Sequence, residues 1–80
     1  MIDELTRQRF RVKSDAIAGP FLMLPYSQLK AVCDVLDRHG IHYWTDSFAV
    51  SLDGKPAQIV INFGRKGDAA RIQAALDEAG

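Results

Sequence analysis

The clearest pattern along the chain is an apolar repeat with the period of a helix, about 3.6 residues, in residues 27–39. Charged side chains occupy the opposite side of this segment. Gly40 follows it as a residue suited to the left-handed conformation of a helix end, and Ile41 can fold back onto the last turn. We therefore predict a helix that ends at Gly40. Its buried stripe is predicted to contain Leu29, Val32, Cys33 and Leu36.

A second helix is predicted near the end of the sequence. The carboxylate of Asp68 can cap its first turn, and the apolar residues that follow again recur at helical spacing. The predicted buried stripe consists of Ile72, Ala75, Leu76 and Ala79.

The remaining apolar residues indicate extended structure. The predicted extended segments are 9–14, 17–24, 42–52 and 57–63. Ser14-Asp15 and Asp53-Gly54 are predicted turns, the second of them a strong hairpin dipeptide. Pro20 cannot donate a hydrogen bond to a sheet, so we expect its strand to begin at an edge or a bulge.

These elements predict one domain over residues 1–80, with the order strand, helix, strand, strand, helix after an extra N-terminal extended segment. Sheet and helices each have one apolar side. We therefore expect an α+β two-layer sandwich, an antiparallel sheet of three to four strands with two helices on one face. This layout resembles a ferredoxin-like domain of the βαββα kind, a topology shared with ACT-like ligand-binding domains. The resemblance covers residues 17–80 as topology only.

A complete ferredoxin-like domain has a fourth strand after its second helix. Residues 9–14 could fill that place by pairing with residues 17–24. Otherwise one sheet edge is open to a partner or a second copy. Residues 1–9 are polar, and we expect them to form a helical turn or a flexible arm.

Charge and cysteine content restrict the function further. Ten basic and ten acidic residues give a net charge of zero, which argues against a general nucleic-acid or membrane binder. The one cysteine, Cys33, permits no intrachain disulfide and suits a cytoplasmic location. The acidic start does not resemble a signal peptide.

The residues that could carry catalysis favour structural roles. His39 and His42 form an H-x-x-H pair, but they lie at a helix end and a strand start, so we expect the rings to diverge and hold no metal. Cys33 lies on the apolar stripe and is expected to be a buried thiol. We predict a protein that is not an enzyme and has no cofactor.

Three groups of residues could bind something. The loop Gly64-Arg65-Lys66-Gly67 leads into a helix and could hold an anion; the alternative is a plain connection. A basic stripe recurs at period two, and it is either a partner-binding surface or a solvated edge strand. Its members are Arg7, Arg9, Arg11 and Lys13. Tyr43, Trp44 and Asp46 form the third group. One of the two aromatic rings must be at least half exposed, because neighbouring strand residues face opposite ways, and it is either an interface anchor or a ring that lies over a sheet face or under the N-terminal arm.

Our first hypothesis is a small protein-binding module of the immunity, inhibitor or adaptor type. It would dock on a protein partner, or on a second copy, through the sheet face or edge around Trp44. The alternative is a dimeric ACT-like domain that binds a small regulatory molecule. The third is a weak nucleic-acid binder that uses the basic stripe.

Overall fold

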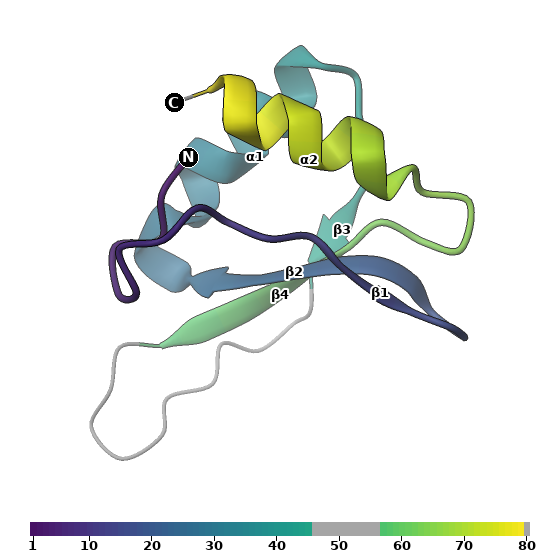
Figure 1. The fold of residues 1–80 in the computed structure, drawn as a ribbon, viewed down its shortest axis with the longest axis horizontal. Coiled ribbons are helices and arrows are strands. Elements are labelled where there is room, and N and C mark those ends of the chain that lie inside the picture. The colour runs from purple at the N-terminus through teal and green to yellow at the C-terminus, as the bar shows by residue number, and fades with distance from the viewer. Residues whose placement is uncertain (46–56, 80) are drawn as a thin grey trace.

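The computed structural model describes residues 1–45 and 57–79 of the chain (Figure 1). The predicted turn at Asp53-Gly54 and most of the predicted strand 42–52 lie outside these residues. The described elements are β1 (Lys13–Asp15), β2 (Gly19–Pro25), the short 3-10 helix η1 (Tyr26–Gln28), α1 (Leu29–Arg38), β3 (Trp44–Thr45), β4 (Gln58–Asn62) and α2 (Ala69–Glu78).

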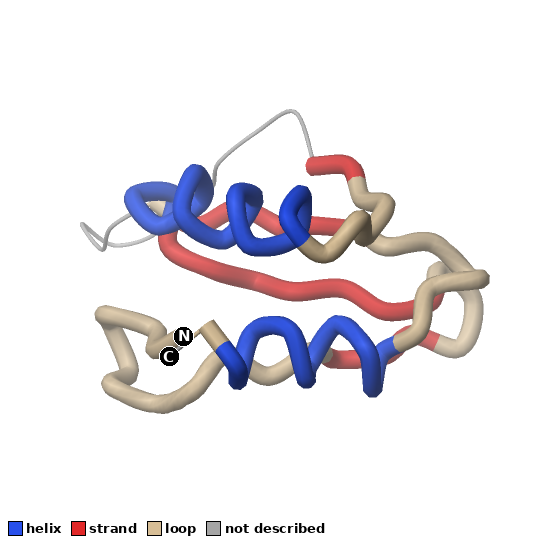
Figure 2. Tube along the Cα trace, turned by 90° about the horizontal axis from the view of Figure 1, so that it is seen from above, coloured by secondary structure: helices blue, strands red, loops and turns tan. Residues whose placement is uncertain are grey.

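The described strands form one antiparallel sheet of four, in the order β1-β2-β4-β3. Both helices lie on the same side of it (Figure 1), and seen from above they flank the central strands (Figure 2). The predicted α+β class is therefore confirmed. The observed order β-β-α-β-β-α differs from the βαββα order of the domains that the sequence resembles, because the additional paired strand β1 precedes β2. Of the predicted segment 9–14, only Lys13 and Ser14 belong to this strand.

Two local predictions around this first strand pair are wrong. Ser14 and Asp15 belong to β1, and the turn follows them, because the Asp15 carboxylate accepts hydrogen bonds from the N–H groups of Ile17 and Ala18. These two hydrogen bonds hold the pKa of Asp15 below its ordinary value, and the bond from Ala18 has the larger effect. Pro20 lies in central strand β2 rather than at an edge, and its carbonyl accepts the N–H of Phe63 at 3.1 Å.

The core lies between the sheet and the two helices. Strand residues that alternate with exposed or half-buried ones supply its lower layer: Leu22, Leu24, Ile59 and Ile61. The helices supply Val32, Val35, Leu36, Ile72, Ala75 and Leu76. The predicted stripes are largely confirmed, with corrections. Leu29 and Cys33 are only partly buried, and Ala79 is exposed because it lies beyond the last turn of α2.

The end of α1 and the start of α2 are formed by the residues from which they were predicted. Gly40 has φ +66°, its N–H donates to the Asp37 carbonyl, and the Ile41 N–H donates to the Leu36 carbonyl. This pair of bonds is a Schellman motif. At the start of α2, Asp68 accepts a hydrogen bond from the Arg71 N–H at 3.1 Å. These caps fix where the loops before β3 and α2 begin and end.

The N-terminal segment lies against the helices. The Met1 amino group donates to the Leu76 carbonyl at 2.5 Å, and Gln28 bonds to the backbone of Ile2 and Glu4. One turn, closed by the Arg7 N–H and the Asp3 carbonyl, brings Arg9 opposite Ile2. The start of the chain is thereby placed beside α2.

Candidate functional site

The sheet has a second face, which points away from the helices. Strand pairing places Lys13 opposite Phe21, Phe21 opposite Asn62, and Asn62 opposite Trp44. Paired residues share a face of the sheet, so one row crosses all four described strands. Met23 and Val60 form the next row. We call this surface the outer face, and define it by Lys13, Phe21, Met23, Trp44, Val60 and Asn62.

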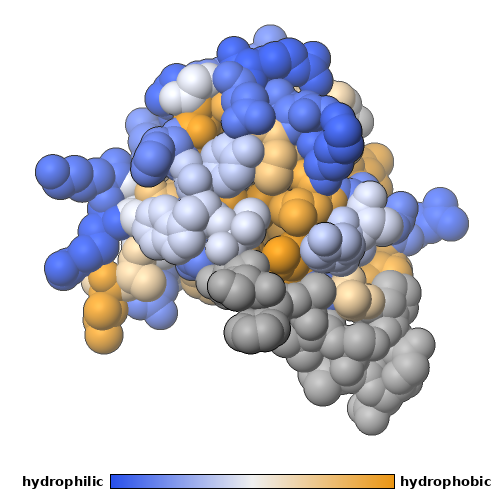
Figure 3. All heavy atoms as spheres, turned by 180° about the vertical axis from the view of Figure 1, so that it is seen from behind, coloured by the Kyte–Doolittle hydropathy of each residue, from blue (hydrophilic) through white to orange (hydrophobic). Residues whose placement is uncertain are grey.

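Large apolar side chains on the outer face are exposed to solvent. Trp44 is 51% exposed and Met23 is 54% exposed, while Phe21 and Val60 between them are half-buried. Among residues 1–45 and 57–79, the other large exposed apolar side chains lie in the N-terminal segment, the β1–β2 turn and η1: Ile2, Leu5, Ile17 and Tyr26. Figure 3 shows the molecule from behind, along the layers rather than onto the outer face, with an apolar area near its middle and polar atoms above it. Exposed Trp and Met beside other apolar residues are typical of contact surfaces.

The ring of Trp44 packs on a glycine. A Cβ atom built on Gly64 would lie 3.4 Å from Trp44 Cζ3, so the bare backbone at Gly64 supports the ring. Gly64 in turn packs on Gly19, where a Cβ would overlap the Gly64 carbonyl and lie 2.7 Å from Arg65 Cα. The start of β2, the loop after β4 and the Trp44 ring therefore form one stack, which holds the ring in place.

Tyr43 faces the core, on the opposite side of the chain from Trp44. It packs against the core, and its hydroxyl donates to the Asp37 carboxylate at 3.0 Å. The neighbouring Cys33 thiol, partial burial and the Asp37 carboxylate together raise the pKa of the Tyr43 phenol. The prediction that one of the two rings is at least half exposed is confirmed, and that ring is Trp44. Asp46, the third predicted residue of this group, lies outside the described residues.

The four basic residues of the predicted stripe do not form one line. Arg7 lies in a turn with φ +62°, where period two does not hold. From Arg9 to Lys13 the alternation holds, with Phe10 buried and Arg11 exposed. Of the four, only Lys13 belongs to the outer face.

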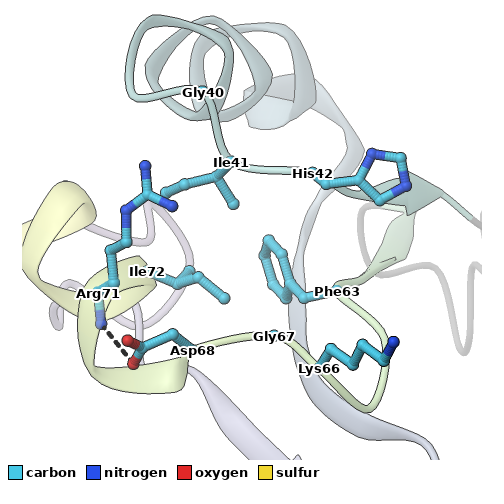
Figure 4. Close-up of a pocket in the computed structure, with 9 residues that line it drawn as sticks. All are labelled: Gly40, Ile41, His42, Phe63, Lys66, Gly67, Asp68, Arg71 and Ile72. Carbon is cyan, nitrogen blue, oxygen red and sulfur yellow. Dashed lines mark hydrogen bonds between the residues drawn. The ribbon is translucent and has the colours of Figure 1, made fainter.

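A cavity of ≈ 280 Å³ lies on another side of the molecule, where the loop after α1 meets the start of α2 (Figure 4). Its floor consists of three core residues that point toward its centre: Ile41, Phe63 and Ile72. Polar side chains form its rim: His42, Lys66, Asp68 and Arg71. The sequence did not predict this cavity, because its walls come from segments about thirty residues apart.

The predicted anion loop Gly64–Gly67 is divided between these two places. Lys66 and Gly67 line the cavity, whereas Gly64 supports Trp44. The Gly67 N–H donates to the Gly64 carbonyl at 3.0 Å, so this donor is already engaged within the loop. The Gly67 N–H is therefore not available to a ligand in the cavity unless this bond breaks.

In residues 1–45 and 57–79, no three His, Cys, Asp or Glu side chains are close enough together to hold a metal ion. None of the described helices is long and apolar enough to span a membrane. No protein-family model, curated protein or solved structure matches the chain.

Proposed function

We propose that the chain is a small, non-enzymatic protein-binding module that docks on a partner protein through its outer face. The observation that carries this proposal is the pairing of two half-exposed apolar side chains, Trp44 and Met23, on the one sheet face that the helices leave open. Interface hot spots are enriched in Trp and are surrounded by contacts that exclude water. Phe21 and Val60 supply such surroundings here.

The charges beside this surface define the partner's chemistry. Lys13 lies in the same cross-strand row as Trp44, and exposed Arg65 follows the glycine that supports the ring. Within the described part of the chain the one ion pair is Lys30–Asp34, so Lys13 and Arg65 have no acidic partner there. The matching partner is a protein with an apolar pocket rimmed by Asp and Glu, and the charges would accelerate its approach.

The fold offers a rigid platform for this role. We interpret it as a ferredoxin-like arrangement in which β1, at the N-terminus, takes the place beside β2 that the last strand occupies in such domains. The sheet order β1-β2-β4-β3 supports this interpretation. An inhibitor of the immunity type or an adaptor needs only a rigid, complementary surface, which a sheet covered by helices on one side can provide.

Site-specific photo-crosslinking in the native host tests the proposal. Benzoylphenylalanine replaces Met23 in one variant and Ile17 in a control, because Ile17 is 78% exposed but lies in the β1–β2 turn. We expect one host protein to crosslink at position 23 and not at position 17. The purified partner should then bind the wild-type chain with an affinity that falls as salt rises.

Two results contradict the proposal. Crosslinking of position 23 to a second copy of the chain would make the outer face a homodimer interface. Equal crosslinking at both positions, or none at position 23, would show that the outer face is not a selective docking surface.

A further inference from the structure

The cavity beside α2 is separate from the outer face and has a chemistry of its own. Its floor is apolar: Ile41, Phe63 and Ile72 are 8%, 4% and 2% exposed, and their side chains point toward the centre (Figure 4). At ≈ 280 Å³ the cavity falls just below the range of about 300–1,000 Å³ for drug-sized ligands. It therefore suits a molecule with a short, branched alkyl group.

The rim of the cavity is predominantly basic. Arg71 stands over one side of the floor, and its Nη2 donates to the His39 carbonyl at 2.6 Å, which holds the guanidinium in place. Lys66 and His42 lie on the other side, and their side chains extend away from the centre of the cavity (Figure 4). A guanidinium with one donor engaged still has further N–H donors for a carboxylate.

The one acidic side chain at the rim is already occupied. Asp68 accepts a hydrogen bond from the Arg71 backbone N–H and caps α2. In residues 1–45 and 57–79, neither Lys66 nor Arg71 forms an ion pair with a carboxylate. The Asp68 carboxylate keeps its negative charge, so Lys66 and Arg71 together leave one net positive charge at the rim, beside the apolar floor.

We propose that this cavity binds a small aliphatic carboxylate. The alkyl group lies over Ile41, Phe63 and Ile72, and the carboxylate pairs with Arg71, with Lys66 adding longer-range attraction. This proposal does not depend on the docking function of the outer face, and it differs from the anion site predicted at Gly64–Gly67 because side chains rather than loop N–H groups hold the anion.

The test is an NMR titration of the ¹⁵N-labelled chain with isovalerate. We expect saturable shifts of the amide signals of Gly40, Ile41 and Gly67, with a Kd on the order of 1 mM for so small a ligand. Isovaleramide has the same shape without the charge, and acetate has the charge without the branched alkyl group. Each should bind about tenfold more weakly or worse.

Three variants locate the anion. Arg71→Gln should weaken isovalerate binding about tenfold, because it removes a guanidinium that pairs with the carboxylate through two N–H donors. Lys66→Gln should weaken it about threefold, because the Lys66 amine is solvated. Arg65→Gln is the matched control, because Arg65 is a basic residue of the same loop that does not line the cavity; its Kd should stay within about twofold of wild type. If Arg71→Gln fails to fold, Arg71→Lys takes its place, because it keeps the positive charge but loses the planar pair of N–H donors, and it should also weaken isovalerate binding.

Several outcomes overturn the proposal. Absence of saturable shifts up to about 50 mM would exclude a site of the expected strength. Equal binding of isovaleramide would remove the role of the carboxylate. Equal binding of acetate or inorganic phosphate would indicate general anion attraction, and equal losses in Arg65→Gln and Lys66→Gln would have the same meaning.

Discussion

The two faces of the sheet are built from neighbouring residues of the same strands, yet they differ in what covers them. In β2, Leu22 is 1% exposed beneath the helices, and Met23, the next residue, is 54% exposed on the outer face. In the loop and strand after α1, Tyr43 packs against the core while Trp44 is half exposed. Both faces are apolar at these positions, and only one has a covering layer among the described residues.

This contrast separates residues that stabilise the fold from residues available for binding. Burial of apolar surface contributes roughly 25 cal/mol per Å², and the helix-covered face gains this within the domain. The exposed surface of Met23 and Trp44 gains it only when another surface covers them. If the two faces differ in this way, substitutions on the covered face should lower stability, and substitutions on the outer face should weaken binding.

The largest expected effect is on stability. Leu24→Ala should lower the free energy of unfolding by about 2–5 kcal/mol, because Leu24 is fully buried and its loss leaves a cavity. Met23→Ala, on the outer face, should change it by less than about 1 kcal/mol. Urea unfolding followed by circular dichroism measures both, and equal costs would mean that the outer face is covered as well.

The second effect is on partner binding. Trp44→Ala should raise the Kd of the crosslinked partner about 30-fold, the loss of a hot spot worth about 2 kcal/mol. Ile17→Ser removes an exposed apolar side chain away from the face and should leave the Kd within about twofold. Isothermal titration calorimetry compares the two variants. An unchanged Kd for Trp44→Ala would remove the outer face from the interface.

A smaller effect tests the stack beneath Trp44. Gly40 and Gly19 both have positive φ, but a Cβ at Gly40 meets nothing within 4 Å, whereas one at Gly19 meets the Gly64 backbone. Gly40→Ala should therefore cost about 1 kcal/mol from backbone strain alone. Gly19→Ala should cost more and should also shift the fluorescence of Trp44. If the two variants are equally stable and leave the emission unchanged, the stack does not hold the ring.

The mildest effect concerns Tyr43, the covered counterpart of Trp44. Its pKa is raised in the folded state, so the folded chain holds the phenol proton more tightly than the unfolded chain. The resulting stability is complete below the ordinary phenol pKa of about 10 and is lost as pH rises through the folded pKa. A Tyr26→Phe variant leaves Tyr43 as the one tyrosine. The rise in absorbance near 295 nm that marks its phenolate should then occur at a higher pH than for an ordinary tyrosine. Adding Cys33→Ala to this variant should lower the pKa of Tyr43. An ordinary phenol pKa both with and without Cys33→Ala would contradict the interaction between Tyr43 and Cys33.

The parts of the fold that could be predicted depend on local interactions. The end of α1 follows from Gly40 and Ile41, and the start of α2 from Asp68, because each cap is completed within a few residues. The position of the first turn was missed because the Asp15 side chain moves it two residues onward. The place of Pro20 in a central strand depends on β1 joining the sheet, which no local pattern shows.

The candidate sites divide in the same way. Period two predicted that Tyr43 and Trp44 face opposite ways. Met23, in contrast, lies in the run Phe21–Leu24, which is apolar on both faces, so the sequence does not show which of its residues the helices cover. The contact of Arg71 with the His39 carbonyl joins residues far apart in the chain. Such contacts arise from packing of the whole domain, so the cavity could be recognised only in the structure.

The most direct test of the docking surface uses the one tryptophan of the chain. The chain is labelled with 5-fluorotryptophan, which gives a single ¹⁹F signal from Trp44, and is titrated with the unlabelled partner identified by crosslinking. Burial of the ring by the partner should shift or broaden this signal in proportion to the bound fraction. A signal that stays unchanged when the partner is fully bound would contradict docking through the outer face.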